Sequence, residues 1–308
     1  MRQFRIILAA EGWHLDYVPV ATMSWKKFFP EMKISLAIVR DNNRDHEYYF
    51  RKYAQYVDTL VSFPDVDDVC RSSLAKMARL YLSTDFGDEI CTLHDIDFCP
   101  LQRGFYEDRY AQYEDGKLML MGLEVYNQTE RGRAPISAMT APSEMFRKVL
   151  DINGTWFDFV DAWRKTGERS PENKDDVLNA PYFSDEILMR TCLRRMGREW
   201  ILANALHIER GYNMQEHTLD RACWNLADWN KLFRGEYLEA HLLKAYKPNL
   251  VVNDKEFDTW GYIPGLLPIL DYIGFEDPYM DTAIDEAVKL YGKERTFHCL
   301  NYKEAVCV

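Results

Sequence analysis

Residues 90–101 read ICTLHDIDFCPL, and this stretch decides the fold. Its first four residues form a short apolar run that predicts a buried strand, and Asp95 and Asp97 follow that run. Two carboxylates that stand two residues apart on an extended backbone point to the same side. Because they follow a buried strand, we expect them at the carboxyl edge of a sheet, where open α/β folds bind ligands.

The paired acids predict a metal site. Two desolvated carboxylates repel each other unless a cation joins them. Mn²⁺ and Mg²⁺ suit oxygen ligands, and phosphate oxygens of a substrate can fill the remaining positions. Taken alone, such a motif is often a pair of solvated loop acids, but its place between ICTL and FCPL favours metal binding. We expect Asp95 and Asp97 to bind Mn²⁺ or Mg²⁺.

The segments around this stretch alternate between strands and helices, which is typical of an α/β fold with a mostly parallel sheet. Apolar runs and apolar periodicity place these elements. The predicted strands are residues 4–10, 34–39, 59–63, 90–93, 118–126 and 237–243, and the predicted helices are residues 18–29, 67–83, 143–150, 156–165, 184–196 and 279–291. We expect a catalytic domain over residues 1–250, with a C-terminal helical extension over residues 251–308 packed on it.

The composition narrows the function. The net charge of −11 has the opposite sign to that of most nucleic-acid binders, so we expect no nucleic-acid partner. No apolar stretch reaches about 18 residues, so we expect no transmembrane segment, and any contact with membrane-bound acceptors would be peripheral. The seven cysteines form no Cys-x-x-Cys pair, which favours reduced core thiols in a cytoplasmic protein.

A polar stripe on the helix before the acidic motif supplies cations. Ser72, Lys76, Arg79 and Ser83 are spaced so that they share one helix face. The stripe is either a solvated face or a contact for a diphosphate or a ribose. We expect Lys76 and Arg79 to bind the donor, with Arg79 contributing to binding and not to folding.

Three further places hold candidate residues. The first strand ends in Ala9 and Ala10 and is followed by Glu11, and we expect these three residues near a nucleotide. Tyr17 is either a stacking partner for a base or a core residue at the start of a helix. Asp185 and Glu186 stand at a predicted helix start, as a general base and acceptor contact or as a plain helix cap. His241 is a candidate metal ligand, and Lys247 is a point charge suited to a phosphate.

Together these residues resemble a known pattern. FRIILAAEGWHLDYVPVATMSWKKFFP (residues 4–30) is similar to the opening strand, nucleotide loop and first helix of GT-A glycosyltransferases. Lys76, Arg79 and LHDIDFCPL resemble the basic helix and DxD motif of the glycogenin/galactosyltransferase-like and mannosyltransferase-like families. The spacing from His241 to Lys247 is similar to the HxxGxxKP element of the glycogenin-like group, although Lys244 stands where that group has Gly.

The resemblance implies a GT-A fold, which is Rossmann-like with a mostly parallel sheet flanked by helices. It implies transfer of a sugar from a nucleotide-diphospho-sugar, expected to be a UDP-sugar, to a hydroxyl of a glycan or another acceptor. Asp95, Asp97 and His241 would bind the metal, and Lys247 would contact the diphosphate. The similar families retain the sugar's configuration, and we expect retention here. An inverting enzyme would instead use Asp185 or Glu186 as its base.

Two alternative functions remain. A nucleotidyltransferase that makes a nucleotide sugar would have a glycine-rich, basic loop after the first strand, and LAAEGWHLDY is neither. A catalytically silent protein of this fold would bind a sugar nucleotide with its metal and transfer nothing.

Overall fold

The computed structural model describes residues 4–41, 44–122, 134–166, 184–209, 214–220, 228–242, 250–252, 255–257, 269 and 271–274. The chain divides into two compact units. The first comprises Met1–Leu15, Glu31–Ile96 and Glu107–Gly211, and the second comprises Asp16–Pro30, Asp97–Tyr106 and Tyr212–Val308. The chain therefore passes from one unit to the other between Ile96 and Asp97, inside the acidic motif.

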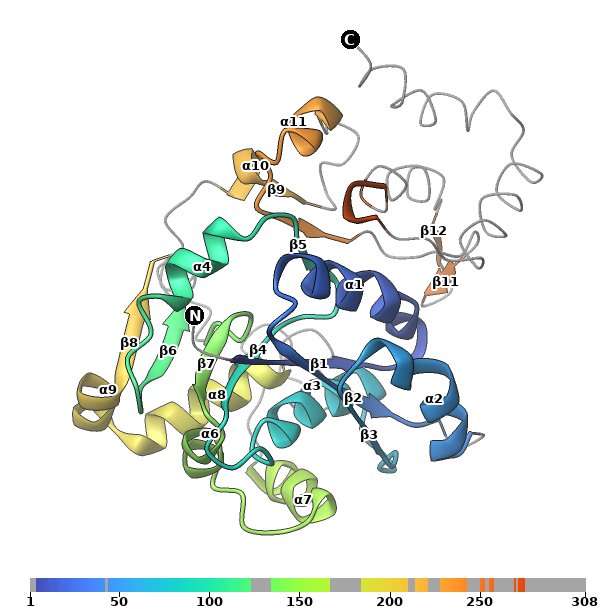
Figure 1. Ribbon diagram of the computed structural model, residues 1–308. Coiled ribbons are helices and arrows are strands. Elements are labelled where there is room, and N and C mark those ends of the chain that lie inside the picture. Colours follow the sequence, from blue (N-terminus) through green and yellow to red (C-terminus); the bar gives the residue numbers. More distant parts are fainter. Residues whose placement is uncertain are drawn as a thin grey trace. The chain divides into compact units, whose positions relative to one another are not determined.

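A seven-stranded sheet forms the centre of the first unit, in the order β3-β2-β1-β4-β7-β6-β8 (Figure 1). Its strands are β1 (Phe4–Ala10), β2 (Lys33–Val39), β3 (Thr59–Phe63), β4 (Ile90–Leu93), β6 (Leu118–Met121), β7 (Met139–Pro142) and β8 (Ala205–Ile208). β7 runs antiparallel to both of its neighbours, and the other pairs are parallel. The predicted α/β class with a mostly parallel sheet is confirmed.

Helices cover one face of this sheet. α3 (Arg71–Leu82), α6 (Ser143–Leu150), α7 (Trp156–Thr166) and α8 (Ser184–Met196) lie together on that face in Figure 1. Their side chains, among them Leu74, Phe146, Val160 and Leu188, form one buried core with the sheet. Each such residue contributes about 1.5–3 kcal/mol by leaving water. The unit also contains α2 (His46–Tyr53), α9 (Arg198–Asn204) and a short turn of helix, η2 (Ala54–Tyr56).

The second unit is built on a smaller sheet, in the order β5-β10-β9. These strands are β5 (Phe98–Pro100), β10 (Glu239–His241) and β9 (Thr218–Leu219). α1 (Val18–Phe28) packs against β5, where the Ser24 hydroxyl donates to the carbonyl of Pro100. The unit also contains α10 (Met214–His217), α11 (Trp229–Phe233) and the paired strands β11 (Leu250–Val252) and β12 (Lys255–Phe257).

Two elements cross the boundary between the units. The helical turn η1 (Gly12–Tyr17) leads from β1 into α1, and α4 (Gly104–Tyr110) leads from the second unit back to the first. Within the described part of the chain, no helix has both the length and the apolar character needed to cross a membrane.

The predicted elements agree with the structure to within a residue or two at most positions, with clear exceptions. The helix predicted from residue 67 begins at Arg71, because Asp68 adopts a left-handed backbone (φ 62°) that a helix cannot contain. The strand predicted over 237–243 shortens to Glu239–His241. The strand predicted over 118–126 ends at Met121, and residues 123–133 lie outside the described residues. The helix predicted over 279–291 lies outside them too, so the boundary at residue 250 stays a prediction.

Three of the four described cysteines are core thiols, as the sequence suggested, and the fourth, Cys70, is free and half-buried. Cys91, Cys99 and Cys192 are free and buried. Burial raises the pKa of the Cys91 and Cys192 thiols to about 12. They therefore stay protonated and pack as small apolar residues.

Candidate functional site

Asp95 follows β4 and belongs to a buried charge cluster in the first unit. Arg79 on α3 donates two hydrogen bonds. One runs from Nη1 to Asp95 Oδ1 at 2.6 Å, and the other from Nη2 to Asp185 Oδ2 at 2.5 Å. The side chains of Arg79 and Asp185 are each 4% exposed, whereas that of Asp95 is 38% exposed. Burial opposes the charge on Arg79, but the two carboxylates outweigh it and raise its pKa. The guanidinium is therefore permanently charged and links the two acids.

The polar stripe on α3 is thus not a solvated face. Arg79 and Ser83 are buried, and the hydroxyl of Ser143 donates to the Ser83 carbonyl at 2.7 Å. The expectation that Arg79 acts apart from folding is at odds with a buried guanidinium between two acids. The helical spacing did not predict this burial. It shows which polar residues share a face of the helix, but not which residues of other elements pack against that face. Lys76 and Ser72 are half-buried.

Asp185 and Glu186 lie in the first turn of α8, which begins at Ser184 as predicted. Asp185 Oδ1 accepts the backbone N–H of Glu186 at 3.0 Å, while its other oxygen accepts from Arg79. The geometry combines a helix-start contact with an ion pair. A role for either residue in binding an acceptor stays a prediction.

The candidates after the first strand differ in accessibility. Ala10 is buried and Ala9 half-buried, both at the end of β1. Glu11 Oε1 lies 3.3 Å from His14 Nδ1, and its side chain is 14% exposed. Tyr17 is fully buried at the residue before α1, so its ring lies in the core and offers no face to a base in this structure.

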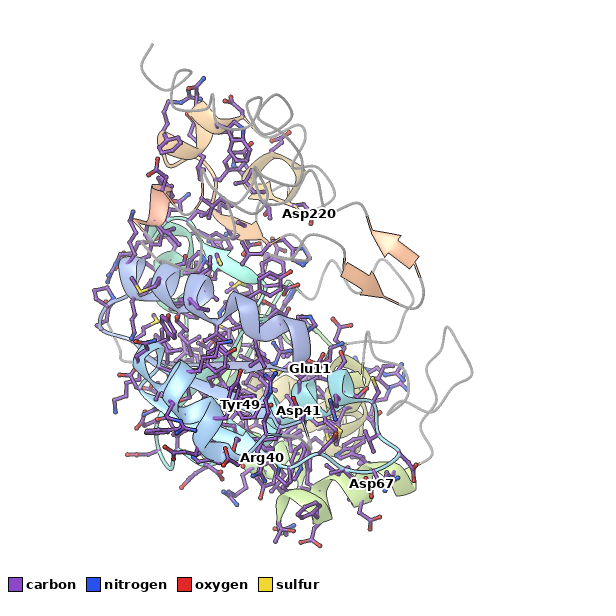
Figure 2. The ribbon with its side chains drawn as sticks, turned by 90° about the vertical axis from the view of Figure 1, so that its right-hand side faces the viewer. Glu11, Arg40, Asp41, Tyr49, Asp67 and Asp220 are labelled. Carbon is purple, nitrogen blue, oxygen red and sulfur yellow. The ribbon has the colours of Figure 1, made fainter. Side chains whose placement is uncertain are left out.

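Arg71 is a cation that sequence reasoning did not single out. Its Nε donates to Asp65 Oδ2 at 2.6 Å, and this hydrogen bond, together with the charges of Asp65, Asp41 and Glu11, outweighs burial and raises the pKa of Arg71. Asp65, Asp41 and Glu11 follow β3, β2 and β1 respectively. Figure 2 labels Glu11, Asp41 and Tyr49. The backbone N–H of Asp41 donates to the hydroxyl of Tyr49 at 3.1 Å. The sequence signal that could have identified Arg71 is a basic residue at the start of a helix that follows a strand.

His241 lies between two carboxylates in the second unit. Its Nε2 is 3.2 Å from Asp97 Oδ2, and its Nδ1 is 3.3 Å from Asp220 Oδ2. The antiparallel register of β10 and β5 pairs His241 with Phe98, and the N–H of Leu242 donates to the carbonyl of Asp97 at 2.7 Å. Strand pairing thus joins two predicted metal ligands that are 144 positions apart in the sequence.

Asp97 and His241 fit a divalent ion as two of its ligands. Two ligands at right angles around an octahedral ion of this kind, each about 2.1 Å away, stand about 3 Å apart. The observed 3.2 Å is close to that separation, and it is also a hydrogen-bond distance. A carboxylate oxygen and an imidazole nitrogen suit Mn²⁺. Each side chain is 15% exposed, so an ion could reach them.

A third protein ligand is not evident from the geometry. No group of three His, Cys, Asp or Glu side chains among the described residues converges to hold a metal. Asp220 lies on the other nitrogen of His241, and Asp95 Oδ1 accepts from Arg79. Lys247, the predicted diphosphate contact, lies outside the described residues. The ligand role of Asp95 stays a prediction.

Comparisons with known proteins gave structural likeness alone. No protein-family profile matches the sequence, and no curated protein matches it. A structure of the galactosyltransferase LgtC with donor and acceptor sugar analogues is 12% identical, with a TM-score of 0.46, covering 91% of this chain and 99% of that one. A structure of the glycosyltransferase GlyE from Streptococcus pneumoniae TIGR4 is 12% identical, with a TM-score of 0.48, covering 93% of this chain. The chain spans 65% and 63% of two GlyE chains, less than two thirds of their length. At these identities and TM-scores the likeness carries no conclusion about the activity of this chain.

Proposed function

We propose that this protein is a metal-dependent glycosyltransferase of the GT-A type, which transfers a sugar from a nucleotide-diphospho-sugar to a hydroxyl of a glycan or another acceptor. The observation that carries the proposal is the 3.2 Å approach of His241 Nε2 to Asp97 Oδ2. A lone histidine far along the chain had no local reason to meet the acidic motif. Its presence there supports a metal site, and the mostly parallel α/β sheet with acids after β4 supports a nucleotide-sugar donor.

In this proposal each candidate residue has a separate role in binding the metal, the donor or the acceptor. Asp97 and His241 bind the ion, which supplies positive charge to a diphosphate leaving group. The resemblance to the DxD motif gives Asp95 as a further ligand, and Arg79 occupies one of its two oxygens. Lys247 contacts the diphosphate, and Asp185 or Glu186 orients the acceptor. UDP is the nucleotide that the resemblance to the glycogenin-like group favours, with retention of configuration.

The test is a panel of nucleotide sugars assayed for hydrolysis and transfer with Mn²⁺, with Mg²⁺ and after EDTA. We expect turnover with at least one donor, its loss in EDTA and its return when Mn²⁺ is added. Asp97→Asn removes a charged ligand and should abolish this turnover in a folded protein. Glu216→Ala, an exposed acid of the second unit, is the matched control and should leave it unchanged.

Two results would contradict the proposal. Turnover that survives EDTA would show that no metal takes part. Metal-dependent UDP binding without hydrolysis or transfer of any donor would instead identify a silent sugar-nucleotide-binding protein.

A further inference from the structure

β10 is the central strand of its sheet, so His241 has neighbours on both sides. On one side lies β5, next to Asp97. On the other, the parallel pairing of Ala240 with Leu219 brings His241 beside Asp220, the residue that follows β9 and that Figure 2 labels. The backbone register of three strands therefore sets both contacts of the imidazole, and Asp220 had no part in the sequence-based site.

The two carboxylates face opposite nitrogens of the ring. A carboxylate only accepts hydrogen bonds, so the 3.3 Å contact with Asp220 and the 3.2 Å contact with Asp97 each call for a proton on the nitrogen they face. An ion at Nε2 would replace the proton there, and the proton on Nδ1 would remain. With that proton donated to Asp220, the imidazole has Nε2 left to bind an ion on the side of Asp97. The arrangement is a carboxylate, an imidazole and a metal position in line, a common way to orient a metal-binding histidine.

Phe98 restricts the ring but cannot orient it. The Phe98 and His241 rings stack with centroids 4.3 Å apart and planes 17° apart. A half-turn of the imidazole about its Cβ–Cγ bond preserves this stack and puts carbon atoms where the nitrogens were. A polar partner at a ring nitrogen distinguishes the two orientations, and both Asp97 at Nε2 and Asp220 at Nδ1 provide one. Once an ion takes Nε2, Asp220 is the carboxylate that still holds the ring by a hydrogen bond.

We propose that Asp220 is a positioning residue that holds His241 with Nε2 toward the metal shared with Asp97. The inference rests on the proposed function, because it concerns the ion of that same site. Asp220 does not itself touch the ion. Its removal should therefore weaken metal binding by freeing the ring, while the protein keeps its fold.

The experiment is a Mn²⁺ titration of the full chain, followed by electron paramagnetic resonance of the free ion. Asp220→Ala should bind Mn²⁺ about 10–100-fold more weakly than the natural chain, the range typical for loss of a partner behind a ligand. Asp220→Asn keeps an acceptor oxygen and should recover part of this loss. Glu216→Ala, which removes an exposed acid of the same unit, should bind normally, and the melting temperatures without metal should agree.

Electron spin echo modulation at saturating Mn²⁺ separates positioning from direct ligation. The natural chain should show coupling to an imidazole nitrogen, His241→Ala should lack it, and Asp220→Ala should lose most of it. If Asp220→Ala keeps the full nitrogen coupling, or binds Mn²⁺ normally while Asp97→Asn does not, Asp220 has no positioning role and the metal site stands. If the natural chain binds no Mn²⁺, or Asp97→Asn binds it normally, the proposed function fails as well.

Discussion

Two clusters in this molecule each place a basic side chain between two carboxylates, but the basic side chains differ in chemistry. Arg79 lies between Asp95 and Asp185 in the first unit, and His241 lies between Asp97 and Asp220 in the second. An arginine has donors on every side, no acceptor, and a charge that it keeps. An imidazole can give up a proton and offer the freed nitrogen to a metal. The first cluster therefore carries its own permanent cation, while the second can take an ion.

Burial reinforces the contrast. The Arg79 and Asp185 side chains are each 4% exposed, so their pairing is made in a medium where an uncompensated charge is costly. Asp97 and His241 are each 15% exposed, and Asp220 is 34% exposed. Asp95, at 38% exposed, is the accessible member of the first cluster. We infer that the Arg79–Asp185 pair mainly supports the fold and that the second cluster mainly serves binding. The stabilities and metal affinities of single variants test that division.

The largest effect is expected from Arg79→Ala. It leaves the buried carboxylate of Asp185 without its cation, and breaking a buried pair in this way costs about 3–5 kcal/mol of unfolding free energy. Urea unfolding measures the loss. Arg79→Lys keeps the charge but loses the two-pronged guanidinium. Its free energy of unfolding should lie between those of the natural chain and Arg79→Ala.

The matched control for Arg79 is Lys76→Ala, one turn earlier on α3 and half-buried. Its cost should stay below about 1 kcal/mol, as for most partly exposed charges. If Arg79→Ala costs no more than this control and only donor affinity falls, Arg79 serves binding and the division between the clusters is wrong.

His241→Ala should show the opposite profile. We expect Mn²⁺ affinity to fall at least about 10–100-fold, because a ligand matters at least as much as the group behind it. The free energy of unfolding without metal should change by about 1 kcal/mol or less, the net worth of an ordinary hydrogen bond. His46→Ala, which changes an exposed residue of α2, is the control. An unfolding loss as large as that of Arg79→Ala would show that both clusters serve the fold.

The two acids around Arg79 should differ from each other. Asp185→Asn removes a buried charge and should cost about 1–3 kcal/mol, whereas Asp95→Asn removes a more exposed one and should cost about 1 kcal/mol or less. Thermal unfolding of both variants and of the double variant compares them. Equal costs would mean that Asp95 supports the fold as much as Asp185 does. Asp95 would then have less to offer a metal.

The smallest effect concerns an ordinary pair in the same unit, which calibrates the others. Arg5 donates Nε and Nη2 to Glu89 at 2.8 and 3.0 Å, and these hydrogen bonds, more than offsetting desolvation, lower the pKa of Glu89. A lowered pKa stabilises the fold above the unfolded-state value and loses that contribution as the pH falls through the folded-state value. Glu89→Gln should therefore reduce the fall in melting temperature at acidic pH. An unchanged profile would leave the acid sensitivity to other groups.

The sequence predicted the elements with a strong local signal. β1 to β4 are apolar runs, and α6 and α8 have clear helical periodicity, so pattern alone located them. β7, β8 and β9 were missed because short strands such as Thr218–Leu219 form only where a neighbour supplies the hydrogen bonds. The same holds for the site. Asp97 stood out through its motif, while Asp220 has no motif and gains its place from strand register, which no single segment encodes.

His241 shows what resemblance added to pattern. Its residue type and spacing to Lys247 suggested a ligand, and the structure brings it to Asp97. Arg79 shows the limit of both. Helical spacing put it on a polar face, but only the approach of α8 reveals Asp185 opposite it and turns that face into an interior.

The backbone hydrogen bond from Leu242 to Asp97 joins two segments that the ribosome makes at different times. Asp97 leaves the ribosome 144 residues before His241, an interval on the order of ten seconds at typical bacterial speeds. Throughout that interval β5 lacks β10, its partner in the sheet, because β10 lies later in the chain. A chain that terminates before residue 241 therefore lacks the metal pair. Completion of synthesis and assembly of this site are coupled, so fragments carrying the acidic motif cannot sequester the ion through Asp97 and His241 together.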